Sequence, residues 1–395
     1  LTEGRGFSVS GQPSDQLIRN MASGSSFTPN ALDLSKYRYN AFFGRIGYTY
    51  KEKYLLSLTG RRDGSSRFGV NNQFENFGSI GLGWILSGEP FLKNTLPFIS
   101  FAKIRGSYGT TGNDQLGNYR FMSLYQSVVP SILYQDQPGL GPTNLPNPNL
   151  EWESNKKLQA GIDLGFVNDR FLLTVNYIRN RVSNSLTDIT LPIIAGFLSF
   201  NDNLAALFEN TGWEFSLRTD LLKSSAVKWN ASVNLTIPRN KLLAFPDLAT
   251  SSFKDLFVIG KSRNITREYV FSGVDPQTGT YFVTDRHGNP TNNPTPEDLY
   301  LPHRLGTQWY GGMQNSLSYG GFQLDFFIQY TNQVSRLPLE FGFPGRLVTS
   351  STTSGNQPAS VMQRWQKPGD VTNYQRFSST PALGLLEQGD RNIGD

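Results

Sequence analysis

The sequence predicts an all-β protein: a fragment of an antiparallel transmembrane β-barrel, with about ten membrane-crossing strands and long outer loops. Three observations predict this fold. Apolar and polar residues alternate over long segments, these segments are long enough to cross a membrane as tilted strands, and the connections between them alternate between short and long.

The alternation is strictest between Val227 and Ile237, where every odd-numbered residue is apolar and every even-numbered residue is polar. Because successive side chains of a strand point to opposite faces, this segment has one apolar face and one polar face. A soluble β-sandwich shows the same pattern, so alternation alone does not establish a membrane protein. Residues 322–331 repeat it with Phe327 as the exception, and weaker versions occur at residues 42–50, 54–61, 80–86, 102–108, 157–166, 171–177 and 213–221.

Segment length and loop length favour the membrane. The alternating segments run for about 10 to 14 residues, whereas soluble strands cluster near 5 to 6, and a tilted strand needs about 9 to 11 to cross the hydrocarbon layer. Outer-membrane barrels place short turns at the periplasmic end and long loops outside. Here short connections at residues 51–53, 167–170, 222–226 and 320–321 alternate with long ones at residues 111–150, 183–210 and 238–305.

Aromatic residues gather near the expected strand ends. Rings with a polar edge settle at the depth of lipid headgroups, so they form girdles at both interfaces of a barrel. We expect Trp213 and Trp309 in the girdle at the long-loop end. The girdle at the short-turn end is expected to contain Tyr48, Tyr50, Tyr54, Trp84, Trp229 and Tyr319.

The strand count predicts how the chain is organised. An even number of strands places both chain ends on the long-loop side. The expected segments are an outer loop over residues 1–39, transmembrane strands with long outer loops over residues 40–332, and a further outer loop over residues 333–395. A plug domain and the closing strands of the barrel are expected to be absent from this chain.

Composition excludes several other classes. Aromatic residues make up 13% of the chain, which is atypical of a disordered protein. The net charge is only +5, without a block of like charge, so nucleic acid is not an expected partner. The chain has no cysteine, which excludes disulfides and thiolate metal sites. No apolar run approaches the length of about 18 residues typical of a transmembrane helix.

Several stretches resemble the SusC/RagA family of TonB-linked outer-membrane transporters, in the C-terminal part of the barrel. They include RRDGSSRFG at residues 61–69, GTTGN at 109–113 and NPNLEWE at 147–153. Each motif is modest by itself, but their order is specific and covers nearly the whole chain. The remaining matches are residues 39–45, 54–60, 81–84, 89–91, 103–108, 210–214, 275–279 and 364–370.

The resemblance implies a barrel of about 22 strands with a plugged lumen. Members lie in the Gram-negative outer membrane of bacteria such as the Bacteroidota, and they import large nutrients, typically oligosaccharides or peptides. The implied partners are outer-membrane lipid, a SusD-like lipoprotein lid, and the TonB system acting through an N-terminal part that this sequence lacks. No cofactor is implied.

Two sets of residues are candidates for function. Charged residues on the polar faces are expected to line the lumen, where they contact the plug or passing substrate, or are simply solvated: Arg45, Lys103, Arg105, Asp163, Glu214, Arg218, Asp220 and Asp325. Aromatic residues of the expected outer loops could pack against substrate, against the lid protein or against one another: Tyr119, Tyr125, Tyr134, Tyr281, Trp365 and Tyr374.

No pattern in the sequence indicates an enzyme or a metal site. The two histidines, His287 and His303, lack the spacing of zinc ligands. The acidic runs at residues 275–279 and 285–289 lack the spacing of a calcium loop, and two turns flanking a short strand at residues 280–284 explain them better.

Two other functions stay open at this point. A passive porin would share the barrel but lack a plug. A soluble secreted carbohydrate-binding β-protein would share the alternation but bury its apolar face against a second sheet.

Overall fold

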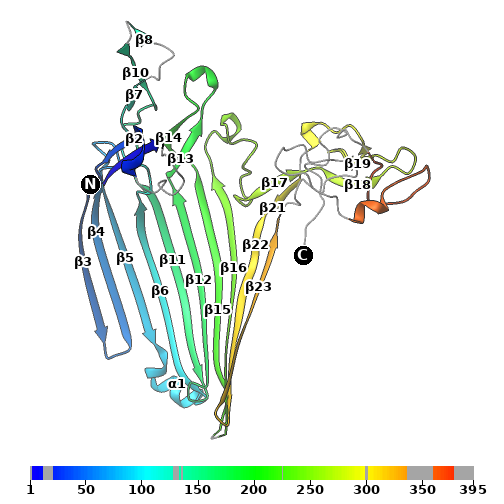
Figure 1. Ribbon diagram of the computed structural model, residues 1–395. Coiled ribbons are helices and arrows are strands. Elements are labelled where there is room, and N and C mark those ends of the chain that lie inside the picture. The colour runs from blue at the N-terminus through cyan, green and yellow to red at the C-terminus, as the bar shows by residue number, and fades with distance from the viewer. Residues whose placement is uncertain are drawn as a thin grey trace. The chain divides into compact units, whose positions relative to one another are not determined.

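The computed structural model describes residues 2–11, 21–127, 133–134, 137–224, 226–298, 301–335 and 359–377. Its main feature is one sheet of ten long strands, with the order β23-β22-β16-β15-β12-β11-β6-β5-β4-β3. Each long strand therefore neighbours the long strand that follows it in the chain, as in an up-and-down barrel wall (Figure 1). The strands are β3 (Tyr39–Tyr50), β4 (Tyr54–Ser65), β5 (Phe74–Ile85), β6 (Ile99–Asn113), β11 (Glu153–Phe166), β12 (Phe171–Ser183), β15 (Leu207–Lys223), β16 (Val227–Ala244), β22 (Gly306–Tyr319) and β23 (Phe322–Val334).

The strand register confirms the two faces that the alternation predicts. Strands β15 and β16 pair antiparallel, and apolar residues face apolar residues while polar residues face polar ones. Pairs in this register lie on one side of the sheet, so the match in chemistry sustains one apolar and one polar surface. The apolar pairs are Trp213–Ile237, Phe215–Leu235 and Leu217–Val233, and the polar pairs are Glu214–Thr236, Ser216–Asn234 and Arg218–Ser232.

The apolar face is exposed along the described strands. Phe42 is 75% exposed, Ile46 66% and Leu324 57%. Large apolar side chains in such numbers do not face water in a soluble domain. The face is therefore suited to lipid, and further exposed members are Leu58, Ile80, Leu82, Ile104, Trp213, Leu217, Trp309, Phe326 and Ile328.

Tight turns join strands at one end of the sheet, which we call the short-turn end. Gly320 and Gly321 join β22 to β23, and both have a positive φ, as a two-residue hairpin of type I′ requires. Lys51 and Glu52 also have a positive φ between β3 and β4. The connection between β5 and β6 contains the short helix α1 (Pro90–Thr95).

The connections at the other end, the long-loop end, contain small sheets of their own. A hairpin precedes the long strands, and the connection from β16 to β22 contains a three-stranded sheet (Figure 1). The paired elements are β1 (Thr2–Ser10) with β2 (Ser26–Ser35), β7 (Tyr125–Ser127) with β10 (Leu140–Pro142), β8 (Leu133–Tyr134) with β9 (Gln137–Pro138), β13 (Ser185–Thr190) with β14 (Ser199–Leu204), β17 (Ile265–Glu268) with β21 (Leu301–Arg304), and β18 (Val270–Val274) with β19 (Tyr281–Thr284) and β20 (Pro290–Thr291).

The chain divides into two compact units. The first comprises residues 1–82, 107–157 and 182–206, and the second residues 83–106, 158–181 and 207–395. Among the residues that the structure describes, no helix has both the length and the apolar character needed to span a bilayer.

The assignment of the two faces of β16 can be tested in the full-length protein. Val233 pairs with Leu217 and Met313 on the apolar face, near the middle of the alternating segment, whereas Asn234 pairs with Ser216 and Gly312 on the polar face. We expect Val233→Arg to cost about 2–4 kcal/mol, because the charge enters the middle of the hydrocarbon layer, and Asn234→Arg to cost much less. Urea titration of the protein folded in lipid vesicles measures both values, and equal losses would contradict the assigned facing.

Candidate functional site

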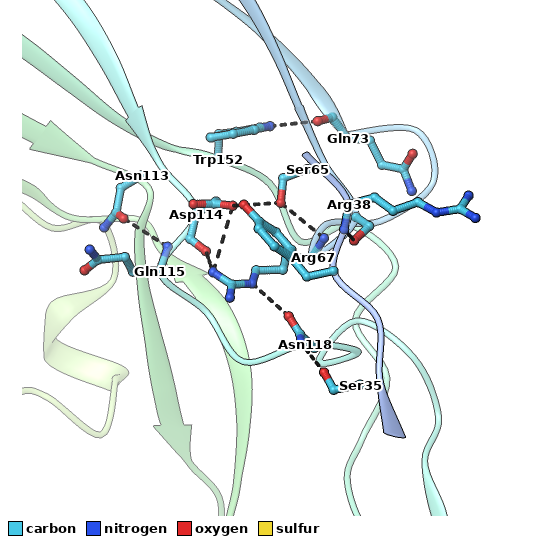
Figure 2. A network of polar contacts seen from close by, with 12 residues as sticks. Ser35, Arg38, Ser65, Arg67, Gln73, Asn113, Asp114, Gln115, Asn118 and Trp152 are labelled. Carbon is cyan, nitrogen blue, oxygen red and sulfur yellow. Dashed lines mark hydrogen bonds and ion pairs between the residues drawn. The ribbon is translucent and has the colours of Figure 1, made fainter. Parts of the chain in front are cut away.

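Three separate sequence motifs meet at the long-loop end of the first unit. The run at residues 61–69 ends β4 and begins the connection to β5, GTTGN ends β6, and NPNLEWE leads into β11. Figure 2 shows their side chains joined by polar contacts, together with residues of the segment before β3. We call this group the long-loop network; its labelled members are Ser35, Arg38, Ser65, Arg67, Gln73, Asn113, Asp114, Gln115, Asn118 and Trp152.

Asp114 is the acceptor at the centre of the network. Its Oδ2 accepts a hydrogen bond from the Tyr37 hydroxyl at 2.7 Å and from the Ser65 hydroxyl at 2.8 Å. Bonds to a charged acceptor are stronger than bonds between neutral groups. Asp114 therefore fastens the segment before β3 and the end of β4 to the end of β6.

Arg67 connects the same carboxylate to the following turn. Its Nη1 lies 4.0 Å from Asp114 Oδ2 and donates to the Asp114 backbone oxygen at 2.9 Å, while its Nε donates to Asn118 Oδ1 at 2.9 Å. The guanidinium also lies 4.2 Å from the centre of the Tyr37 ring, within the range of a cation–π contact. Asn118 in turn donates to the Ser35 hydroxyl at 2.5 Å, so this series of hydrogen bonds extends to the end of β2.

The electrostatics of Tyr37 reflect this surrounding. Its partial burial raises the pKa of the phenol, and the hydrogen bond to the Asp114 carboxylate raises the pKa further. The neutral phenol is the form that can donate to Asp114, so the network favours a protonated Tyr37.

An apolar core lies beside these polar contacts. Phe68 and Leu150 are fully buried, and Trp152 packs against Phe68 with ring centres 4.8 Å apart and edge-on against Phe77 at 5.7 Å. The Trp152 indole donates to the Gln73 backbone oxygen at 3.0 Å, so its polar atom is satisfied inside the core. The 61–69 and NPNLEWE motifs therefore carry residues of one packed core.

The backbones of the two motifs approach closely at Gly69. The Gly69 N–H donates to the Leu150 backbone oxygen at 3.2 Å, and a Cβ at residue 69 would lie only 1.8 Å from the Pro148 oxygen. Glycine is required here because any side chain would collide with backbone. This close approach is the physical reason for the last residue of the RRDGSSRFG motif.

The NPNLEWE segment also binds the hairpin of β13 and β14. Asn147 Nδ2 donates to Asp202 Oδ1 at 2.8 Å and to the Asn201 backbone oxygen at 3.0 Å. Asn203 Nδ2 donates to the Glu151 oxygen at 2.9 Å. These backbone and side-chain hydrogen bonds hold the β13–β14 hairpin against the NPNLEWE segment within the first unit.

Among the expected lumen residues, the structure pairs Arg105 with Asp163. The Arg105 Nε lies 3.0 Å from Asp163 Oδ2, and Arg105 also donates to Asn176 Oδ1. The other Asp163 oxygen accepts from the Thr174 hydroxyl at 2.9 Å. The pair is half-exposed, so its contribution to stability is small, about 0–1 kcal/mol.

The remaining lumen candidates lie apart from this pair. Arg45 donates to the Ser57 hydroxyl at 3.2 Å, and Asp325 accepts from Gln323 at 2.8 Å. The Asp220 backbone exchanges hydrogen bonds with Arg170 near the short-turn end. Lys103, Glu214 and Arg218 lie on their strands without a charged partner among the described residues.

The aromatic loop candidates have different surroundings. Tyr281 is buried in a small core with Val274, Phe271 and Trp365, and the Trp365 indole donates to the Pro276 oxygen at 2.9 Å. Tyr119 accepts a hydrogen bond from the Lys36 N–H at 2.6 Å, and the Tyr374 backbone pairs with Trp365. Tyr125 is exposed, whereas the Tyr134 side chain lies outside the described side chains.

The two acidic runs form turns, as the sequence interpretation expects. Asp275 accepts from the Thr278 hydroxyl and the Gln277 N–H, and Asp285 accepts from the N–H groups of Asn289 and His287. These bonds hold the pKa of both carboxyls below the usual range, with the Thr278 hydroxyl and the Asn289 N–H as the largest causes. Within the described part of the chain, no three His, Cys, Asp or Glu side chains group as metal ligands.

Comparison with known proteins identifies a family model and several relatives that match this chain. Residues 4–337 match the family model described as "TonB dependent receptor-like, beta-barrel". The chain is 33% identical to a TonB-dependent receptor of Formosa agariphila over 92% of this chain and 39% of the relative. It is 27% identical to the TonB-dependent receptor SusC of Bacteroides thetaiotaomicron over 73% of this chain and 30% of the relative.

Solved structures share the fold. The RagAB peptide importer in its "closed-closed" state matches with a TM-score of 0.75 and 23% identity, over 94% of this chain and 42% of that one. The chain thus spans about two-fifths of the length of the receptor from Formosa agariphila and of the matched RagAB chain.

The core at the long-loop end makes a second test in the full-length protein. Phe68 is fully buried, whereas Val70 in the same loop is 77% exposed. We expect Phe68→Ala to lower the local free energy of opening by about 3–5 kcal/mol, because it leaves a cavity beside Trp152, and Val70→Ala to change it by less than about 0.5 kcal/mol. Hydrogen exchange of the amides in residues 61–77 and 147–153 measures both. Equal protection in the two variants would show that the motifs do not depend on this core.

Proposed function

We propose a function from the premise that the chain belongs to the TonB-dependent receptor-like β-barrel family: it forms part of the wall of an importer of large nutrients. Family membership places it in the outer membrane, as part of a transmembrane β-barrel. The family is one of receptors and transporters. The observation that carries the proposal is the single sheet with one exposed apolar face and one polar, charged face.

The polar face supports a hydrated passage. Charges such as the Arg105–Asp163 pair and Arg45 lie among serines, threonines and asparagines, which is the composition of a wet lumen wall. We propose that the eight charged lumen candidates contact the plug or the passing substrate in the full-length protein. Glu214 and Arg218 support this most directly, because their strand places them on the polar face without a charged partner among the described residues.

We propose oligosaccharides or peptides as the substrate class. The RagAB peptide importer is named for the import of peptides, and its fold is shared with this chain. Exposed Tyr125 at the long-loop end offers an aromatic face of the kind that packs against sugar rings or apolar side chains. Tyr119, Trp365 and Tyr374 are half-buried, and Tyr281 is buried, so these residues more readily support the loops.

We propose two partners for the full-length protein, a SusD-like lipoprotein and the TonB system. A lipoprotein lid requires a firm surface, and the long-loop network with its buried core supplies one in the first unit. TonB supplies energy from the inner membrane to a plug. The sheet edges at β3 and β23 also need neighbouring strands in lipid, which the rest of a larger barrel provides.

The two alternatives lose their basis. A soluble secreted protein is inconsistent with the outer-membrane family and with the exposed apolar face. A passive porin shares the wall but not the family, and it would transport without TonB.

Transport in cells tests the proposal. We expect a strain that carries the full-length protein and its lipoprotein neighbour to take up fluorescently labelled peptides or oligosaccharides above the mass limit of porins. Deletion of tonB should abolish this uptake, since plug movement requires its energy. Uptake that continues without TonB would identify a passive pore. Equal uptake by strains with and without the full-length protein would contradict the proposal.

A further inference from the structure

The apolar face of the second unit ends in a group of charged residues at the long-loop end. Arg179 and Arg181 continue the odd-numbered apolar positions of β12, and Arg239 and Lys241 continue those of β16. Glu209 pairs with Lys241 across β15 and β16. We call Arg179, Arg181, Glu209, Arg239 and Lys241 the outer rim.

Contacts place three of the rim residues on one side of the sheet. Arg181 Nε lies 2.8 Å from Glu209 Oε2, and Lys241 Nζ lies 3.6 Å from Glu209 Oε1. Two positions further along the same face of each strand, the rings of Tyr177 and Trp213 lie 5.0 Å apart. Arg179 follows Tyr177 at the next position of this face, so the rim begins next to two aromatic rings of the apolar face.

The rim is strongly cationic. The set contains four basic side chains and one carboxylate, which pairs with Arg181 and Lys241, so the positive charge exceeds the negative charge. The Glu209 side chain is only 8% exposed, whereas Arg181 is 41% and Lys241 49% exposed. The carboxylate is covered, and the cations face outward.

An open apolar groove lies beside the rim. It has a volume of about 580 Å³ and is lined by Leu235, Ile237, Trp309 and Tyr330. Trp309 and Tyr330 meet edge to face at 5.5 Å and form one wall. Arg239 Nη1 donates to the Gln308 oxygen at 2.8 Å and to the Pro238 oxygen at 2.9 Å, which holds this guanidinium next to the groove.

The depth of the rim matches that of lipid headgroups. From Val227 to Ile237 the apolar positions of β16 cover ten residue steps. At about 3.3 Å per residue this is about 33 Å of strand, and a tilt of about 40° reduces it to about 25 Å, the height of the apolar band of a barrel. Arg239 and Lys241 lie just beyond this band.

We propose that the rim and groove form a binding site for an acylated lipid of the outer leaflet whose headgroup carries phosphate. An acyl chain lies in the groove between Ile237, Trp309 and Tyr330, and the phosphate binds the cations of the rim. Charge complementarity selects this occupant, because a zwitterionic headgroup gains little from a cationic rim. The lipid site requires only that the protein lies in the outer membrane. A negative result in the transport experiment would therefore not contradict the lipid site.

Native mass spectrometry of the full-length protein in non-ionic detergent tests the site. The probes are dioleoyl phosphatidic acid and dioleoyl phosphatidylcholine, which share acyl chains and differ in headgroup charge. Arg179→Gln with Lys241→Gln removes two rim cations and leaves the Arg181–Glu209 pair. Arg263→Gln is the matched control. The Arg263 guanidinium lies 5.4 Å from the ring of Phe208, and Phe208 precedes Glu209 in β15, so it faces the opposite side of the sheet.

We expect the wild-type protein to retain phosphatidic acid at least fivefold more tightly than phosphatidylcholine. The double variant should weaken phosphatidic acid binding by about fivefold for each cation removed, and Arg263→Gln should leave it unchanged. Trp309→Ala should weaken both lipids alike. Equal retention of the two lipids, an unchanged double variant, or full displacement of phosphatidic acid by millimolar inorganic phosphate would each overturn the lipid site.

Discussion

The structure depends on one constraint: in hydrocarbon, every backbone N–H and C=O must find its partner within the protein. Long strands paired to their neighbours meet it, and the consequence is that one side of each strand must then tolerate lipid. The alternation in β16 follows directly, with Val233 and Leu235 on one face and Ser232 and Asn234 on the other. The same constraint explains why the short turns are so tight, since Gly320 and Gly321 allow β22 and β23 to pair up to Tyr319 and Phe322.

Beyond the membrane, water relaxes that constraint and the chain is held by other means. At the long-loop end of the first unit, Asp114 gathers hydrogen bonds from Tyr37 and Ser65, and Trp152 packs on Phe68. These contacts join segments far apart in the sequence. They hold the loops in a defined shape.

Much of the fold follows from the sequence, because lipid and lumen act on every second residue. The ten long strands, their faces and the short turns are all confirmed. The sequence does not reveal that β15 begins at Leu207 or that β16 extends to Ala244, since alternation of apolar and polar residues stops at Ile237 while backbone pairing continues. The small sheets of the loops lack a repeating pattern, and the Arg67–Asp114 contact spans too many residues for any local signal. The motif at residues 61–69 does belong to the long-loop network, but only the structure shows which groups Arg67 and Gly69 contact.

The central claim is that odd-numbered residues of β16 face lipid while even-numbered residues face a hydrated lumen. Single spin labels at positions 231 to 236 of the full-length protein in lipid bilayers measure this directly, through collision with oxygen in lipid and with a water-soluble nickel complex. The account predicts that oxygen access peaks at 231, 233 and 235 and nickel access at 232, 234 and 236. The same access at neighbouring positions, or nickel access on the odd positions, would contradict it.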